Sequence, residues 1–102
     1  MNSSDRFKTV MFLREEIKSF ISSNLDYDDF LENGVPLDLL SELRESVVSR
    51  LVERVPTATI HSLSVGVPED HQGVLNVSAS YGPTDDPSSS RTVSMIVGVF
   101  RE

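Results

Sequence analysis

Histidine and acidic side chains are the residues of this sequence whose types could do chemistry. His61 and His71 are its two histidines, and Glu69 and Asp70 directly precede His71. Imidazole and carboxylate groups bind zinc and related metals, which makes this set a candidate metal site. Its spacing matches no metal-binding motif, because His61 falls in an expected strand and His71 in an expected turn. We therefore expect polar surface side chains here, with no metal and no cofactor.

A second group of possible ligands is the acidic segment 24–35, which contains Asp26, Asp28, Asp29 and Glu32. An EF-hand needs acids at loop positions 1, 3 and 5, a glycine at position 6 and a glutamate at position 12. The segment does not have that spacing. We expect a solvated acidic loop that ends in the Asn33-Gly34 turn signal.

Pairs of glutamates could serve a glycosidase, which needs two carboxyl groups about 5 to 9.5 Å apart across a cleft. Glu15 and Glu16 point to different sides of an expected helix, and Glu42 and Glu45 share a solvated helix face. The chain also has no glycine-rich phosphate loop, no GxSxG or HExxH motif and no cysteine. The sequence predicts no enzyme, and a small hydrolase is the alternative from that class.

Length and charge restrict the remaining classes. The chain has 102 residues and a net charge of −7, with acids in excess in both halves. Nucleic-acid and anionic-membrane binding rely on basic surfaces, so neither partner is expected. No apolar run is long enough to cross a bilayer, and the first ten residues do not form a secretory signal. One domain over 1–102 is expected, divided into segments 1–35, 36–56 and 57–102.

Two helices are predicted in the first half. Apolar residues at helical spacing predict a helix from about Asp5 to Ser23, capped by Ser3, Ser4 or Asp5. A short helical turn over 28–31 is an alternative within the acidic loop. The second helix is predicted over 36–56, with Pro36 in its first turn and its end just before Pro56. The apolar positions are Val10, Leu13, Ile17, Phe20 and Ile21 in the first helix, and Leu40, Leu43, Val47, Leu51 and Val55 in the second.

Three strands are predicted in the second half, over 59–67, 74–81 and 91–100. Short polar connections favour an antiparallel meander, with a long polar loop over 82–90. In the second strand Leu75, Val77, Ala79 and Tyr81 share one face. The fold class is therefore α+β, with two amphipathic helices packed on a three-stranded antiparallel sheet.

The alternation of the first strand breaks once, between Ile60 and Leu63. A regular strand would place Ile60 on the face opposite Leu63 and Val65. We therefore predict a β-bulge or a bend at His61–Ser62, and a bulge would return these side chains to one face.

Two parts of the sequence carry more apolar side chains than one core-facing side of a helix or strand requires. Phe7, Met11 and Phe12 widen the first helix, either to cover the core or to contact a partner. The segment 93–100, VSMIVGVF, carries no charge, and no lysine follows Thr57. Unguarded edge strands invite strand addition from a partner. The alternative is that a helix or the chain terminus covers this edge.

The junction of the halves resembles the baseplate-wedge or sheath-initiator family of contractile phage tails, which is related to a wedge protein of type VI secretion. The resemblance rests on the order helix, proline, strand, and on the spacing of Pro56, Ala58, Ile60, Leu63 and Val65. The Glu-Pro-Arg motif of that family is incomplete, because Val55 and Thr57 stand where its charges belong.

The resemblance implies a structural subunit of a virion tail, assembled in the host cytoplasm. It would join the wedge core to the first sheath ring, in several copies, with sheath and wedge proteins as partners. A tail-terminator or completion subunit and a small cellular protein-binding domain are the alternatives. The predicted partner-binding residues are Phe7, Met11, Phe12, Pro56, Thr57, Val93, Met95, Val97, Val99 and Phe100.

Overall fold

The first helix, α1, spans Ser3–Asn24 in the computed structural model, which describes residues 2–69 and 73–99. Its cap is Asn2, whose side-chain oxygen accepts a hydrogen bond from the Asp5 N–H at 2.8 Å. The sequence prediction placed the cap one to three residues later. An asparagine in this place satisfies an N–H that has no partner inside the helix.

Replacing Asn2 with alanine should therefore destabilise the protein modestly. The variant loses the acceptor for the Asp5 N–H, and caps of this kind contribute about 0.5 to 2 kcal/mol. Urea denaturation followed by circular dichroism measures the change. Asn2→Asp keeps the acceptor and is the control. Equal losses in both variants would show that the side-chain oxygen is not what caps α1.

A third helix corrects the prediction of two. The segment predicted as an acidic loop contains α2, Tyr27–Asn33, which includes the short helical turn offered as an alternative. Asp26 caps it by accepting from the Asp29 N–H at 3.0 Å. The acids at its start suit the positive end of a helix, and it stops at Gly34, whose φ of 75° favours glycine.

The last α-helix, α3, spans Leu39–Arg54 and starts later than predicted. Pro36 lies in the preceding turn, where its carbonyl accepts a hydrogen bond from the Leu39 N–H at 3.1 Å. The end agrees with the prediction, because Pro56 forces Val55 out of helical geometry.

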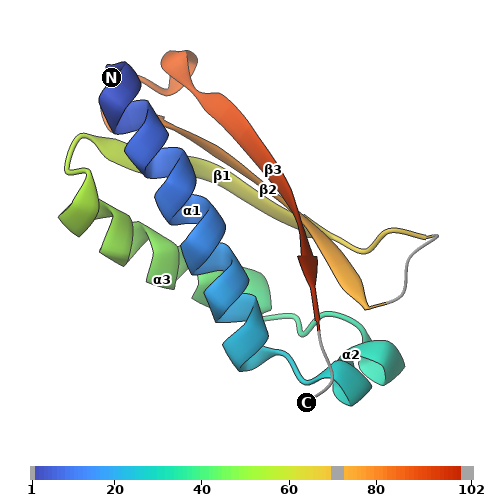
Figure 1. Ribbon diagram of the computed structural model, residues 1–102. Helices are drawn as coiled ribbons and strands as arrows, with labels where there is room; N and C mark the ends of the chain where they lie inside the picture. Colours follow the sequence, from blue (N-terminus) through green and yellow to red (C-terminus); the bar gives the residue numbers. More distant parts are fainter. Residues whose placement is uncertain (1, 70–72, 100–102) are drawn as a thin grey trace.

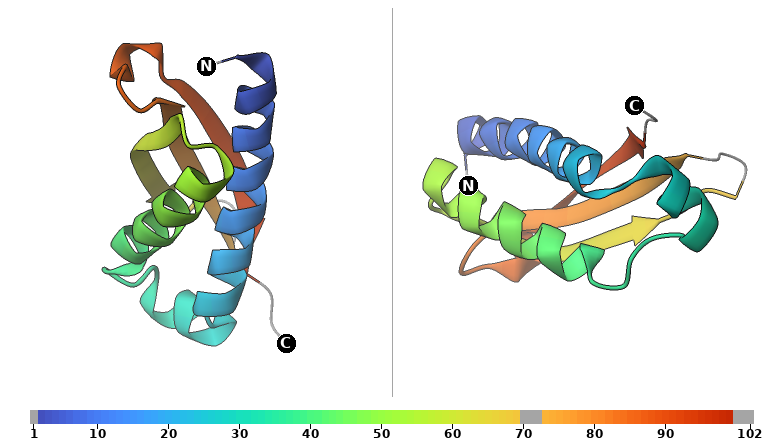
Figure 2. Two further views of the ribbon diagram at one scale, coloured as in Figure 1. Left: turned by 90° about the vertical axis from the view of Figure 1, so that its left-hand side faces the viewer. Right: turned by 90° about the horizontal axis from the view of Figure 1, so that it is seen from below.

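The sheet consists of β1 (Ala58–Gly66), β2 (Val74–Pro83) and β3 (Arg91–Gly98), antiparallel and in the order β1-β2-β3. The fold class is α+β, as predicted. Helices α1 and α3 lie on one face of the sheet, and the described helices leave the other face open (Figures 1 and 2).

The core forms where these layers meet. Side chains from the inner faces of both helices and of the sheet are buried together. In β2 the inward residues are those that alternation predicted, Leu75, Val77, Ala79 and Tyr81. The helices contribute chiefly Leu13, Ile17 and Ile21 from α1, and Leu39, Leu43, Val47 and Leu51 from α3.

The bulge predicted at His61–Ser62 is present. Ile60 pairs with Tyr81 and Ser62 with Ser80, so that His61 is the extra residue. Ile60 is buried and Leu63 packs partly against the same core, on the same face. The His61 Nε2 atom lies 3.1 Å from the Pro83 carbonyl oxygen, which places the bulge beside the end of β2.

The loop after β2 is more regular than predicted. It contains a 3₁₀ helix, η1, at Pro87–Ser89. The Ser88 and Ser89 hydroxyls both donate to the Asp86 carboxylate, and the Thr84 N–H donates to the Thr57 carbonyl at 3.0 Å. These bonds give a polar segment a defined shape.

Candidate interaction surface

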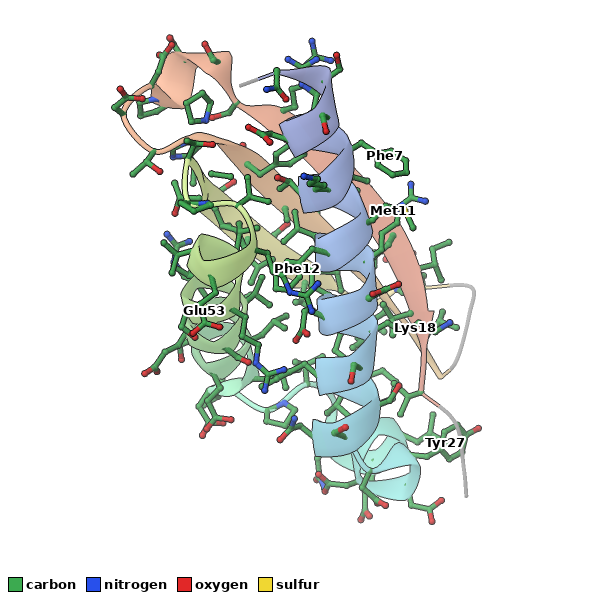
Figure 3. The ribbon with its side chains drawn as sticks, turned by 60° about the vertical axis from the view of Figure 1, so that its left-hand side comes forward. Phe7, Met11, Phe12, Lys18, Tyr27 and Glu53 are labelled. Atoms are coloured by element: carbon green, nitrogen blue, oxygen red, sulfur yellow. The ribbon has the colours of Figure 1, made fainter. Side chains whose placement is uncertain are left out.

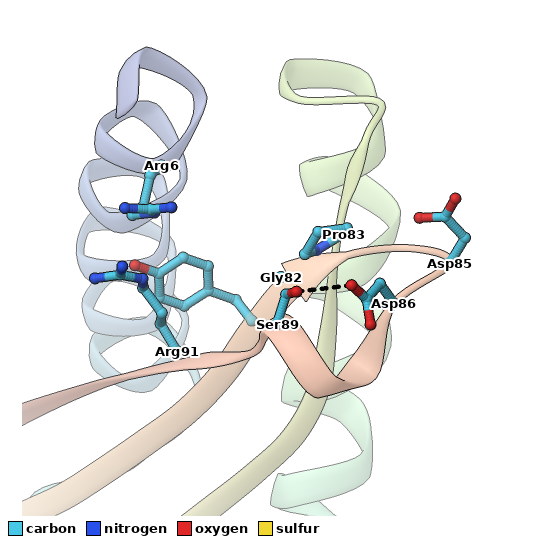
Figure 4. Close-up of a pocket in the computed structure, with 8 residues that line it drawn as sticks. Arg6, Gly82, Pro83, Asp85, Asp86, Ser89 and Arg91 are labelled. Atoms are coloured by element: carbon cyan, nitrogen blue, oxygen red, sulfur yellow. Dashed lines mark hydrogen bonds between the residues drawn. The ribbon is translucent and has the colours of Figure 1, made fainter. Parts of the chain in front are cut away.

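Four charged side chains line a pocket beside the η1 loop (Figure 4). Arg6 and Arg91 lie on one side of the pocket and Asp85 and Asp86 on the other, and Tyr81 and Ser89 also line it. Hydrogen bonds from Ser88 and then Ser89 hold the pKa of Asp86 below its usual range. A carboxylate with a lowered pKa is a weaker base, so its bond to Ser89 orders the loop and is poorly suited to activating the hydroxyl.

Serine, histidine and aspartate do meet at this end of the molecule, which raises the question of a catalytic triad. In a triad the serine bonds to the histidine, and the histidine to the carboxylate. Here Ser88 and Ser89 donate directly to Asp86, while the nitrogen His61 Nε2 contacts the Pro83 carbonyl. This arrangement is not that of a nucleophile activated by an imidazole.

Metal-binding geometry is also absent from residues 2–69 and 73–99, where no three histidine or acidic side chains group around a common point. His71 and Asp70, two members of the candidate metal site, lie outside the described residues. Across the same ranges, no helix is long and apolar enough to span a membrane.

The predicted partner-binding residues lie in three parts of the chain: α1, the junction of α3 and β1, and the segment 93–100. Phe7 and Met11 are exposed on α1, at 68% and 43%, as a partner surface requires. Phe12 is buried on the α3 side of the same helix, where the Arg54 guanidinium lies 5.9 Å from the centre of its ring (Figure 3). Phe12 was therefore wrongly assigned to the surface. Pro56 and Thr57 are exposed at the junction of α3 and β1, far in the chain from the first group.

The assignments in β3 also need correction. Val93, Val97 and Val99 are buried and Met95 is half-buried, because these side chains face the core. Their side chains cannot form a partner surface while the fold is intact. Phe100 lies outside the described residues. The outward side chains are those of Thr92, Ser94 and Ile96, and Ile96 is 68% exposed.

The backbone of β3 can bind a partner strand, although its buried side chains cannot contact one. The Val99 N–H donates to the Gly73 carbonyl at 2.7 Å, so this pair faces inward. Antiparallel pairing alternates, which turns the N–H and C=O groups of Thr92, Ser94, Ile96 and Gly98 toward the free edge. Within the described part of the chain, no hydrogen bond reaches these outward groups. They form a template for one more strand.

The opposite edge of the sheet is partly guarded. On β1 the bulge interrupts the ladder, and the Arg44 guanidinium donates to the outward carbonyl of Ile60 at 3.4 Å. Bulges and charged side chains are common ways of protecting an edge strand from pairing. The two edges are therefore unequal, and β3 is the more accessible of them.

The sequence analysis missed two residues of this surface, Arg14 and Lys18. They continue the row of Phe7 and Met11 along α1, at spacings of three and four residues, and they line a groove with β3. The row can be read from helical periodicity. Its position beside β3 cannot, because it depends on how α1 crosses the sheet.

Comparisons with protein-family models, with curated proteins and with solved structures find no match to this chain. The similarity to the sheath-initiator family therefore rests on the sequence pattern around Pro56 alone.

Proposed function

We propose that this protein is a structural subunit that joins a larger assembly by adding a partner strand to the free edge of β3. The observation that carries the proposal is the row of outward backbone groups from Thr92 to Gly98, which have no partner among the described residues. Strand addition gives affinity through main-chain hydrogen bonds and specificity through neighbouring side chains. Phe7 and Met11, which are exposed on α1, would supply apolar contact to the same partner.

The assembly that we propose is the baseplate of a contractile phage tail. Support comes from the helix-proline-strand order at Pro56 and from the residue skip after Ile60, which forms a bulge in this fold. In that assembly the protein would join wedge proteins to the first sheath ring, in several copies. The missing charges at Val55 and Thr57 mean that the contacts made by the Glu-Pro-Arg motif of the family do not transfer to this chain.

Ser94→Pro tests the edge directly. The Ser94 N–H points outward, so proline removes one donor and blocks close approach without breaking the ladder to β2. The loss of one edge hydrogen bond together with the steric block should weaken capture of sheath or wedge proteins about tenfold or more. The measurement is a pull-down from cells that produce the candidate partners, quantified against the unaltered chain.

Ser94→Ala is the matched control. It also loses the 3.0 Å bond between the Ser94 and Ser78 hydroxyls, but it keeps the backbone N–H. Capture should survive in this variant. Full capture by Ser94→Pro would refute strand addition at β3, whereas a stable ring of this chain alone would indicate a tail terminator.

A further inference from the structure

The groove between α1 and the edge of β3 carries positive charge. Arg14 and Lys18 line it from α1, and the segment from Ser94 to Val97 lines it from β3. The helix and the strand run side by side in the same direction, since Arg6 lies near Arg91 at one end and Lys18 near Ile96 further along (Figure 1). A strand added to β3 would therefore lie alongside α1.

The two groove cations are not neutralised. Neither Arg14 nor Lys18 has an ion-pair partner among the described residues, in contrast to Arg50, which pairs with Glu16 at 3.0 Å. Glu15, three residues before Lys18 on α1, is exposed and forms no ion pair with either cation among the described residues. A local cationic site on a chain with a net charge of −7 is a specific feature of this groove.

From this groove we infer the chemistry of the strand that adds to β3, and the inference rests on the proposed function. The partner is an extended segment of another protein that presents two acidic side chains to Arg14 and Lys18, and two apolar side chains to Met11 and Phe7. The partner residues that alternate with these four side chains face the open side of the sheet, beside Ser94 and Ile96. The charges are complementary at one end and the surfaces apolar at the other.

The spacing of the two elements agrees with this assignment. The steps from Phe7 to Met11 and from Arg14 to Lys18 each advance about 6 Å along α1, and the step from Met11 to Arg14 advances about 4.5 Å. Two residues of a strand advance about 6.8 Å, so alternate partner side chains match the spacing within each pair, and the two pairs together differ from the strand by about 4 Å over their full length. A partner antiparallel to β3 would have its acids first, in the order acid-x-acid-x-apolar-x-apolar.

A second copy of this chain fits the groove less well. Antiparallel pairing of two β3 edges places both α1 helices on the same side of the joined sheet, next to each other. When the two-fold axis passes through the part of β3 that lines the groove, Arg14 and Lys18 of one copy would face Arg14 and Lys18 of the other. Like charges in contact oppose association, which favours a different, acidic partner.

Three synthetic peptides test the inference. The first is acetyl-Glu-Thr-Glu-Thr-Val-Thr-Val-amide, the second has the same residues in reverse order, and the third has lysine in place of both glutamates. Fluorescence anisotropy of labelled peptides measures binding to the full chain. The first peptide should bind most tightly. The double variant Arg14→Glu, Lys18→Glu should weaken its binding roughly tenfold and should favour the lysine peptide.

Lys8→Glu is the matched control, since Lys8 is an exposed cation of α1 that does not line the groove. This variant should leave the ranking of the three peptide affinities unchanged. Equal binding of all three peptides, still lost in Ser94→Pro, would overturn the charge inference and leave strand addition standing. Binding that Ser94→Pro does not affect would overturn both. Absence of binding for every peptide, or dimers of the chain that use β3, would also overturn the inference.

Discussion

Deletion of Ser78 is expected to abolish folding, whereas deletion of His61 is expected to leave the fold intact. Ser78 lies in the central strand and pairs with both Ser64 and Ser94. His61 is the extra residue of the bulge in an edge strand. The two deletions each remove one residue from a strand, and they differ in what happens to the faces of the sheet.

In β2 the side chains alternate without interruption from Leu75 to Tyr81. Removing Ser78 shifts one half of the strand by a residue, so that either Leu75 and Val77 or Ala79 and Tyr81 turn to the open face. Fully burying a large apolar side chain contributes about 1.5 to 3 kcal/mol, and the exchange also brings polar residues into the core. Because domains are stable by only about 5 to 15 kcal/mol, the variant should not fold.

In β1 the deletion has the opposite consequence. With His61 removed, Ile60 opposite Tyr81 and Ser62 opposite Ser80 become consecutive pairs of a regular ladder. Ile60, Leu63 and Val65 stay on the core side. The main loss is the contact of His61 with the Pro83 carbonyl, about 1 kcal/mol.

Circular dichroism, urea denaturation and amide dispersion in NMR spectra distinguish the two variants. Deletion of Ser78 should give no cooperative transition, and deletion of His61 should give one near that of the unaltered chain. If deletion of His61 also unfolded the protein, the bulge would be a requirement of the fold and not an accommodated extra residue.

The second large effect is expected from Leu43→Ala. Leu43 lies on the inner face of α3 with no exposed surface, packed in the core between α1 and the sheet. Alanine leaves a cavity there, and such changes destabilise proteins by about 2 to 5 kcal/mol. Alanine also has the higher helix propensity, so a loss of stability would report on packing and not on α3 itself.

Leu37→Ala supplies the matched control, because Leu37 is fully exposed in the turn before α3. The same chemical change should alter the free energy of unfolding by less than about 0.5 kcal/mol at this site. Urea denaturation of both variants gives the difference. Similar losses at the two positions would contradict the packing of α3 described above.

Much of the fold follows from local rules that the sequence states directly. Alternation in β2 identified the buried face, Pro56 fixed the end of α3, and the skip after Ile60 predicted the bulge. Helix α2 was predicted as a loop because the segment is short, with seven residues, and acidic. Its stability depends on the Asp26 cap and on the buried Phe30. A pattern that short carries little periodic information.

The interaction surface was predicted less well, and the residues show why. Periodicity grouped Val93, Met95, Val97 and Val99 correctly, but it could not say that this group faces the core. Phe7 and Phe12 are equally apolar in the sequence, yet α3 covers only Phe12.

By itself, the sequence determined the alternating faces of β2, the end of α3 before Pro56, and that the class is α+β. The tertiary structure decided which faces are covered and which edge stays free. It also decided that Arg14 and Lys18 lie beside β3. The physical reason is that side-chain period is set by the geometry of one element, whereas exposure is set by how distant elements pack together.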